Sequence, residues 1–339
     1  MGDIIMINKI YEKIINFIKE EYLFIILMIF ILFLGFYHLP YNIYVGGGII
    51  NLDERVEVSN SKDLSGNLNI CYVKSLRGTI PTYLLSYVFD WQRVSINDAK
   101  VDENDNAKDM WRREELYLEE ANSSSIIAAY KLKGYGLTIN KELLKVLYLY
   151  KESESDLKIG DTIISINNVL LKEFDDIKDI IKNFNVGDKI SIVYERDGKV
   201  NEGYFYLKEI EGEKKAGLYL VKLYDYDIDN EISFKFKSSE GGSSGGLMTS
   251  LYIYNKIAKD VTKGRKIVGT GTIDSDGNVG EIGGVKYKLK GAVKSKADIF
   301  FVPEKNYEEA INEKKKNNYD IDIIMVKTLS DAVNYLEGR

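Results

Sequence analysis

The chain has 339 residues, of which 45% are hydrophobic and 29% charged, and its formal net charge is −6. This composition is typical of folded globular protein, and the length suggests two or three domains. The acidic balance argues against a nucleic-acid-binding protein, which usually presents a basic face.

The chain contains one cysteine, Cys71, and one histidine, His38. A single cysteine excludes an intramolecular disulfide and a cysteine-only metal site, and we expect Cys71 to be a small apolar core residue. Because no histidine follows His38, the rest of the chain cannot form a Ser–His or Cys–His pair or a His-rich zinc site. Any general base is then Lys, Asp, Glu, Tyr or water. We expect no metal and no cofactor.

An apolar run lies near the N-terminus. Residues 22–39 (YLFIILMIFILFLGFYHL) contain no Asp, Glu, Lys or Arg, and Pro40 follows them. As a helix they would rise about 27 Å, so the run predicts a transmembrane anchor that ends before Pro40. A buried core helix and a cleaved signal peptide are the alternatives, but the preceding segment is long and of mixed charge, and no small-x-small cleavage site follows.

The flanking charges predict an orientation. Lys9, Lys13 and Lys19 precede the run, and no Lys or Arg follows it until Arg55. The positive-inside rule therefore predicts a single-pass protein of the cell membrane, with an amphipathic cytoplasmic segment over residues 1–21 and all later residues outside the cell.

Residues 40–125 read as short strands separated by turns, as in NIYVGGGIINL (42–52) and LNICYVKSLRG (68–78). The triple glycine Gly46–Gly48 predicts a bend or bulge, since no Lys-Ser/Thr follows it as in a phosphate-binding loop. We find no Walker motif in the chain, so we do not expect ATP use.

Residues 126–212 contain strands around one helix. DLKIGDTIISINN (156–168) predicts a strand that ends in an Asn-Asn turn, FDDIKDIIKNF (174–184) predicts a helix, and VGDKISIVYERDGK (186–199) predicts a strand and its hairpin. The stretch LKIGDTIISINNVLL resembles the "LKxGDxIxxINGxxV" segment of PDZ domains. The resemblance implies capture of extended peptide ends at a sheet edge. The alternative is a spacer or dimerisation module, because no carboxylate-binding loop is recognisable near residues 145–151.

Farther on, a strand-like ISFKF (232–236) leads through a glycine-rich turn into an amphipathic helix. Ser244 lies in this turn, just before the helix, where unpaired backbone N–H groups can stabilise an oxyanion. A flexible Gly-Ser linker is the alternative, and the flanking strand and helix argue against it.

Residues 266–293 predict a strand, a tight turn at Asp276–Gly277 and a Lys-rich helix. Asp274, Asp276 and Asn278 imitate the start of an EF-hand loop, but Val279 stands where that loop requires glycine, so we exclude calcium.

Three motifs in order resemble the catalytic domain of Lon proteases, which has Gly-Pro-Ser-Ala-Gly-aliphatic, then Thr-Gly, then Gly-Gly-x-x-x-Lys. Here these are Gly242–Leu247, Thr270–Gly271 and Gly283–Lys288. The resemblance implies a Lon-type proteolytic α+β domain over residues 213–339. It implies that Ser244 is the nucleophile, Lys288 the base and Thr270 its orienting partner, with backbone amides of Gly242, Ser243 and Gly245 around the oxyanion.

Two departures affect this assignment. Ser243 replaces the family's proline and Gly245 its alanine, so Ser243 is the alternative nucleophile. A lysine acts as a base only when it is neutral, which requires burial to lower its pKa. We expect this of Lys288; the alternative is that Lys286, Lys288 and Lys290 all lie on the surface.

The predicted fold is α+β, with a single N-terminal transmembrane helix, a PDZ-like β-rich domain and a Lon-type proteolytic domain. It resembles the membrane-anchored PDZ–Lon serine proteases of Gram-positive bacteria, which implies an ATP-independent endopeptidase acting outside the cell on peptide or protein substrates. The alternatives are a catalytically weak or inactive PDZ-containing surface protein that binds peptides, and a signal-peptidase-like Ser–Lys enzyme. Because residues 213–339 are few for a catalytic domain, we hypothesise that residues 40–125 supply its early strands.

Overall fold

The computed structural model describes residues 2–98, 100 and 105–338. The chain divides into two compact units. The first runs to Val45 and resumes at Lys74, and the second comprises Gly46–Val73 and the chain from Lys100 onward.

The first unit contains the N-terminal helices and a small hairpin-like element. Strand β4 pairs antiparallel with the first part of β1, and Tyr41 lies opposite Ser95. The elements are α1 (Gly2–Glu20), α2 (Tyr22–Phe36), the start of β1 (His38–Asn51), α3 (Ile80–Val88) and β4 (Gln92–Ser95).

Helix α2 corrects the predicted membrane anchor. It holds 15 residues, Tyr22–Phe36, and after it Tyr37 is extended and the chain enters β1 at His38. Fifteen residues rise about 22 Å, less than the ~30 Å of a bilayer's hydrocarbon core. Within the described residues, we find no helix of sufficient length and apolarity to cross a membrane. The predicted transmembrane helix over residues 22–39 is therefore wrong, and the finding contradicts the single-pass localisation that was derived from it.

The second unit is built on a mainly parallel sheet with the strand order β18-β17-β14-β3-β1. Strand β3 pairs in parallel with β14, so strands from before and after the PDZ-like segment share one sheet. The division into domains predicted from the sequence stays a prediction. The sheet strands are β3 (Asn67–Thr79), β14 (Lys266–Gly269), β17 (Ile299–Pro303) and β18 (Asp322–Val326).

The alternation of side chains along these strands forms two apolar layers, one on each face. Ile267 and Phe301 point to the layer that contains α6, whereas Val268 and Phe300 point to the layer that contains α7. The helices are α4 (Ala107–Lys133), α6 (Gly246–Ile257), α7 (Val285–Lys294), α8 (Glu304–Asn317) and α9 (Leu329–Gly338). The short elements are η1 (Leu52–Glu54), β2 (Val56–Val58), β13 (Ile232–Phe234), β15 (Thr272–Ile273) and β16 (Val279–Gly280).

The PDZ-like module is a sheet with the order β12-β5-β6-β8-β9, covered by helix α5. The structure confirms the predicted helix as α5 (Phe174–Ile181), and it confirms the Asn-Asn turn, where Asn167 and Asn168 have φ of 47° and 63°. The strands are β5 (Leu137–Leu149), β6 (Thr162–Ile166), β7 (Val169–Leu170), β8 (Lys189–Arg196), β9 (Lys199–Tyr206), β10 (Lys208–Ile210), β11 (Glu213–Lys215) and β12 (Leu218–Ile228).

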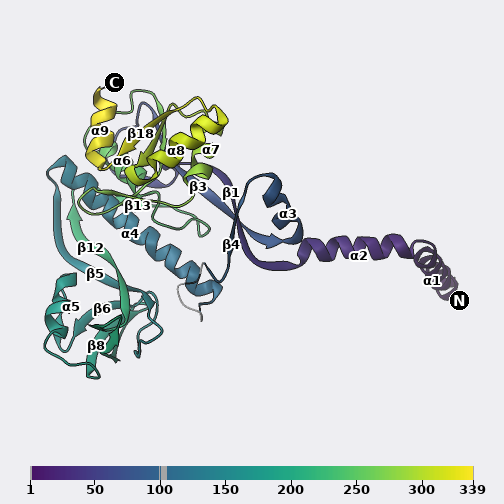
Figure 1. Ribbon diagram of the computed structural model, residues 1–339, viewed down its shortest axis with the longest axis horizontal. Coiled ribbons are helices and arrows are strands. Elements are labelled where there is room, and N and C mark those ends of the chain that lie inside the picture. Colours follow the sequence, from purple (N-terminus) through teal and green to yellow (C-terminus); the bar gives the residue numbers. More distant parts are fainter. Residues whose placement is uncertain (1, 99, 101–104, 339) are drawn as a thin grey trace. The chain divides into compact units, whose positions relative to one another are not determined.

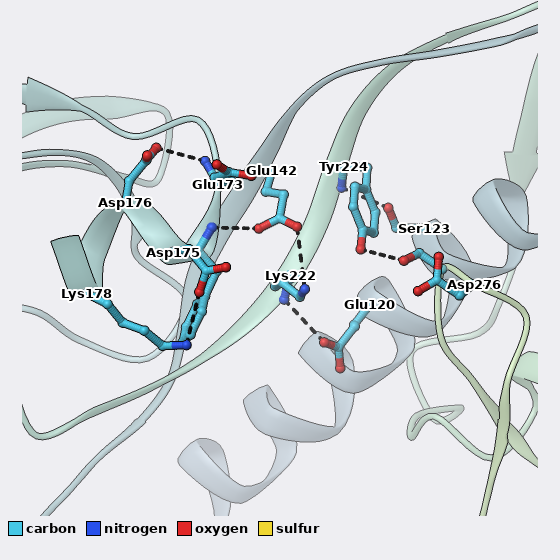
Figure 2. A network of polar contacts seen from close by, with 12 residues as sticks. Glu120, Ser123, Glu142, Glu173, Asp175, Asp176, Lys178, Lys222, Tyr224 and Asp276 are labelled. Carbon is cyan, nitrogen blue, oxygen red and sulfur yellow. Dashed lines mark hydrogen bonds and ion pairs between the residues drawn. The ribbon is translucent and has the colours of Figure 1, made fainter.

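Helix α4 leads into the module and also contacts its edge strand β12 (Figure 1). The backbone N–H of Lys222 donates to Glu120 at 3.2 Å, and that of Tyr224 donates to Ser123 at 3.0 Å. The Lys222 ammonium continues this network to Glu142 on β5 at 3.4 Å (Figure 2). At Lys222 and Tyr224, side chains of α4 therefore accept the hydrogen bonds that a neighbouring strand would accept from β12.

The triple glycine lies inside strand β1 and does not form the predicted bend. A Cβ added at Gly47 would lie 2.2 Å from the carbonyl oxygen of Tyr72 on β3, closer than real atoms approach. At Gly46 the nearest atoms would be 3.8 Å away, an ordinary contact. Gly47 is thus required by a close backbone approach.

We predict that Gly47→Ala lowers the free energy of unfolding by about 2 kcal/mol or more, because the clash is with backbone and forces β1 and β3 apart. Urea unfolding of the purified chain measures this. Gly46→Ala is the matched control and should cost much less; equal losses for the two variants would contradict the steric argument.

Candidate active site

Ser244 lies in a structured loop between β13 and α6. It is partly buried and stands two residues before Gly246, where α6 begins. Gly242 has φ of +88°, a conformation that glycine adopts without strain. A Cβ added at Gly246 would lie 2.7 Å from Ile273, so the loop packs tightly on its surroundings. The loop is not a flexible Gly-Ser linker.

Lys288 is buried in the first turns of α7, with 4% of its surface exposed. The buried side chains of Val285, Leu289 and Val268 belong to the same layer. Burial lowers the pKa of Lys288 from 10.5 to about 8. Lys290 on the same helix is exposed. This confirms the prediction that Lys288 is buried while other lysines of the helix face solvent.

Thr270 connects the two predicted catalytic residues. The Lys288 ammonium donates to Thr270 Oγ1 at 3.3 Å, and this hydroxyl donates to the backbone carbonyl of Ser244 at 3.1 Å. The N–H of Gly271 donates to the same carbonyl at 2.9 Å. Between these described residues, no hydrogen bond joins Ser244 Oγ directly to Lys288 Nζ. The structure therefore brings Ser244, Thr270 and Lys288 together through Thr270, an arrangement that can tighten when substrate binds.

The sheet explains how these residues meet. Ser244 precedes α6 on one face, and Lys288 belongs to α7 on the other face. Thr270 directly follows Gly269, the last residue of β14. Residues from both faces can meet beyond the carboxyl end of a parallel strand, which is where open sheets of this kind carry their sites.

The amides predicted to hold an oxyanion differ in their availability. Gly242 N–H donates to the carbonyl of Glu114 at 2.9 Å and is already occupied. In the described part of the chain, the N–H groups of Ser244 and Gly245 have no intramolecular acceptor. These two amides near the start of α6 are the better placed donors.

Arg55 fixes the start of the loop, a role that the sequence did not suggest. Its guanidinium binds both carboxylate oxygens of Glu240 at 2.9 Å, and Glu240 also accepts the N–H of Lys237 at 2.9 Å. Such bidentate pairs fix orientation as well as distance. The partners are 185 residues apart, and no local pattern links them.

Helix α4 holds the other end of the loop. The Ser125 hydroxyl donates to the carbonyl of Gly246 at 3.0 Å, in addition to the contact between Glu114 and Gly242. Both loop ends are thus fixed by residues that precede the PDZ-like module.

Cys71 lies on β3 beside α7 and is 1% exposed, as the predicted apolar core residue. Burial raises the pKa of its thiol, so it stays protonated.

Comparisons with known proteins agree with this site. Residues 237–337 match the Lon protease (S16) C-terminal proteolytic domain, which this chain therefore contains. Lon protease of Campylobacter jejuni is 32% identical over 121 residues, which cover 34% of this chain and 14% of that protein. The chain thus spans a small part of this relative's length. The matched domain indicates a serine peptidase.

Two solved structures are similar to part of this chain. The PDZ domain of an SdrC-like protein from Listeria monocytogenes is 26% identical, with a TM-score of 0.22, covering 25% of this chain and 90% of that one. The second domain of a Listeria protein is 23% identical, with a TM-score of 0.20, covering 26% of this chain and 87% of that one.

We predict that Lys288→Met raises the free energy of unfolding at pH 7 by about 1–3 kcal/mol, because it removes a buried amine whose protonation burial disfavours. In the unfolded chain this lysine keeps its proton up to about pH 10.5, whereas in the folded chain its pKa is about 8. The stability of the wild type should therefore rise between pH 8 and 10.5, and the difference between the proteins should shrink over that range. Urea unfolding at several pH values measures this. Equal stability at pH 7 would mean that the amine is hydrated.

Proposed function

We propose that the chain is a serine endopeptidase that cleaves peptides or proteins without nucleotide, with Ser244 as nucleophile and Lys288 as general base. The observation that carries the proposal is the buried Lys288 amine, whose pKa is about 8 and whose Nζ contacts Thr270 beside the Ser244 loop. A neutral lysine next to a serine in a glycine-rich turn supplies the general base and the nucleophile that acyl transfer requires. The Lon-type proteolytic domain over residues 237–337 supports the same assignment.

The proposed reaction runs through an acyl-enzyme. Neutral Lys288 accepts the proton of Ser244 Oγ as this oxygen attacks the peptide carbonyl. The amides of Ser244 and Gly245 stabilise the oxyanion. The ammonium of Lys288 then protonates the leaving amine, and water, deprotonated by the same lysine, releases the acid. Thr270 keeps the lysine amine directed toward the serine.

We also propose that the PDZ-like module captures extended substrate segments. Its edge strand β12 begins at Leu218, and side chains of α4 accept the backbone N–H groups of Lys222 and Tyr224. The stretch from Leu218 to Val221 is therefore the part of this edge to which a peptide strand can add. Catalytic residues outside this module act on what it holds.

The alternative is a catalytically weak or inactive protein that binds peptides through the module. The missing direct hydrogen bond between the described residues Ser244 and Lys288 is the observation that favours it. Measuring turnover decides between the two proposals.

We predict that Ser244→Ala lowers the hydrolysis of an unfolded protein by at least about 10³-fold, since removing a nucleophile leaves only background catalysis. New N-termini are identified by mass spectrometry after incubation with the purified chain and no nucleotide. Ser243→Ala is the matched control and should keep most activity. If Ser243→Ala abolishes cleavage and Ser244→Ala does not, the nucleophile is Ser243; if the wild type resembles Ser244→Ala, the capture function replaces the protease.

The rate should depend on pH through Lys288. Because the base form is the neutral amine, kcat/KM should rise with pH and level off above about pH 8, where burial places the pKa. Initial rates on one peptide from pH 6 to 10 measure this. A profile that keeps rising to pH 10 would contradict a desolvated base.

A further inference from the structure

Glu114 lies on α4 beside the loop that carries Ser244. Its backbone carbonyl accepts the N–H of Gly242 at 2.9 Å. Its carboxylate oxygen Oε2 lies 3.0 Å from the position that a Cβ would take on Gly242. Gly242 is two residues from Ser244, so the Cα atoms of the two are at most about 7 Å apart. The carboxylate therefore lies close to the residue that carries the proposed nucleophile.

Partial desolvation raises the pKa of this carboxyl, and the nearby Arg113 guanidinium lowers it. Glu114 is exposed, and among the residues that the structure describes no hydrogen bond or ion pair reaches its side-chain oxygens. The neighbouring cations bind other carboxylates: Arg113 binds Asp105, Arg112 binds Glu115 at 3.0 Å, and Arg55 binds Glu240 at 2.9 Å. The Glu114 carboxyl thus has no ion-pair partner among the residues that the structure describes.

We propose that Glu114 is a specificity-determining residue that favours substrates with a Lys or Arg side chain near the scissile bond. This inference rests on the proposed function and adds the class of substrate. When a substrate strand passes the loop at Gly242, a cation on it gains an ion pair with Glu114. An acidic side chain at the same position meets repulsion.

Glu114 suits this role because its backbone carbonyl and its side-chain carboxylate make different contacts. Its backbone carbonyl holds Gly242, and a substitution of the side chain leaves that hydrogen bond in place. Substrate preference can therefore be altered without removing the atom that fixes the loop.

The test uses the purified full chain and a set of peptides that share one cleaved sequence. Each position on both sides of the scissile bond carries Arg, Gln or Glu in turn, and kcat/KM is measured for each. At one position the wild type should cleave the Arg peptide about fivefold faster than the Gln peptide, as expected for one partly exposed ion pair. High salt should reduce this ratio.

The variants separate charge from structure. In Glu114→Gln the Arg-to-Gln ratio should fall to about one, in Glu114→Lys the Glu peptide should become the better substrate, and Glu114→Asp should restore part of the preference. Glu115→Gln, on the same helix, is the control and should keep the wild-type ratio. Thermal unfolding checks that each variant is folded.

Two results would overturn the inference. One is a wild type with no preference for a cation at any position, and the other is an Arg-to-Gln ratio that Glu114→Gln leaves unchanged. If the wild type and Ser244→Ala behave alike on every peptide, the proposed function fails and this inference fails with it. Failure of the proposed function can be distinguished from failure of the Glu114 inference alone, because in the latter case cleavage still depends on Ser244.

Discussion

A lysine amine enclosed among apolar side chains loses its hydration, and the folded chain must hold it there against that cost. Lys288 is in this position, and its burial depends on how closely α7 packs on the sheet. A Cβ added at Gly291 on α7 would lie 3.2 Å from the carbonyl oxygen of Gly48. The glycine-rich part of β1 therefore lets this helix approach, although it lies more than two hundred residues earlier in the chain. The base of the proposed reaction is thus set by a contact between distant segments.

Helix α4 has a comparable role for the proposed nucleophile. One part of it contacts the serine loop through Glu114 and Ser125, and Glu120 and Ser123 hold the edge strand of the PDZ-like module. A single helix of 27 residues therefore contacts both the loop and the module. The two sets of contacts share the same turns of α4, since Glu120 and Ser123 lie between Glu114 and Ser125.

Local patterns predicted what is locally determined. The Asn-Asn turn, helix α5 and the core position of Cys71 follow from neighbouring residues. The burial of Lys288 was predicted from a motif, although it depends on how α7 packs against β1. The sequence did not reveal the Arg55–Glu240 pair, because its members are far apart. It also did not reveal the close approach at Gly47, which depends on a neighbouring strand. The anchor prediction over residues 22–39 failed because hydropathy counts apolar residues and does not show where the helix ends, at Phe36.

The departures from the Lon motif follow from the packing around the loop. An alanine at position 245 would place its Cβ 2.8 Å from Ile70 Cδ1 on β3, with two further atoms of the same side chain within 3.4 Å. Glycine there leaves room for Ile70, which belongs to the apolar layer under α6. The loop also lacks the proline that would restrict its backbone, but Arg55 and α4 restrict it from outside. The rigidity of this loop is thus supplied by contacts from Arg55 and α4. A loop restrained in this way can present Ser244 in one geometry although four of the six residues from Gly241 to Gly246 are glycine.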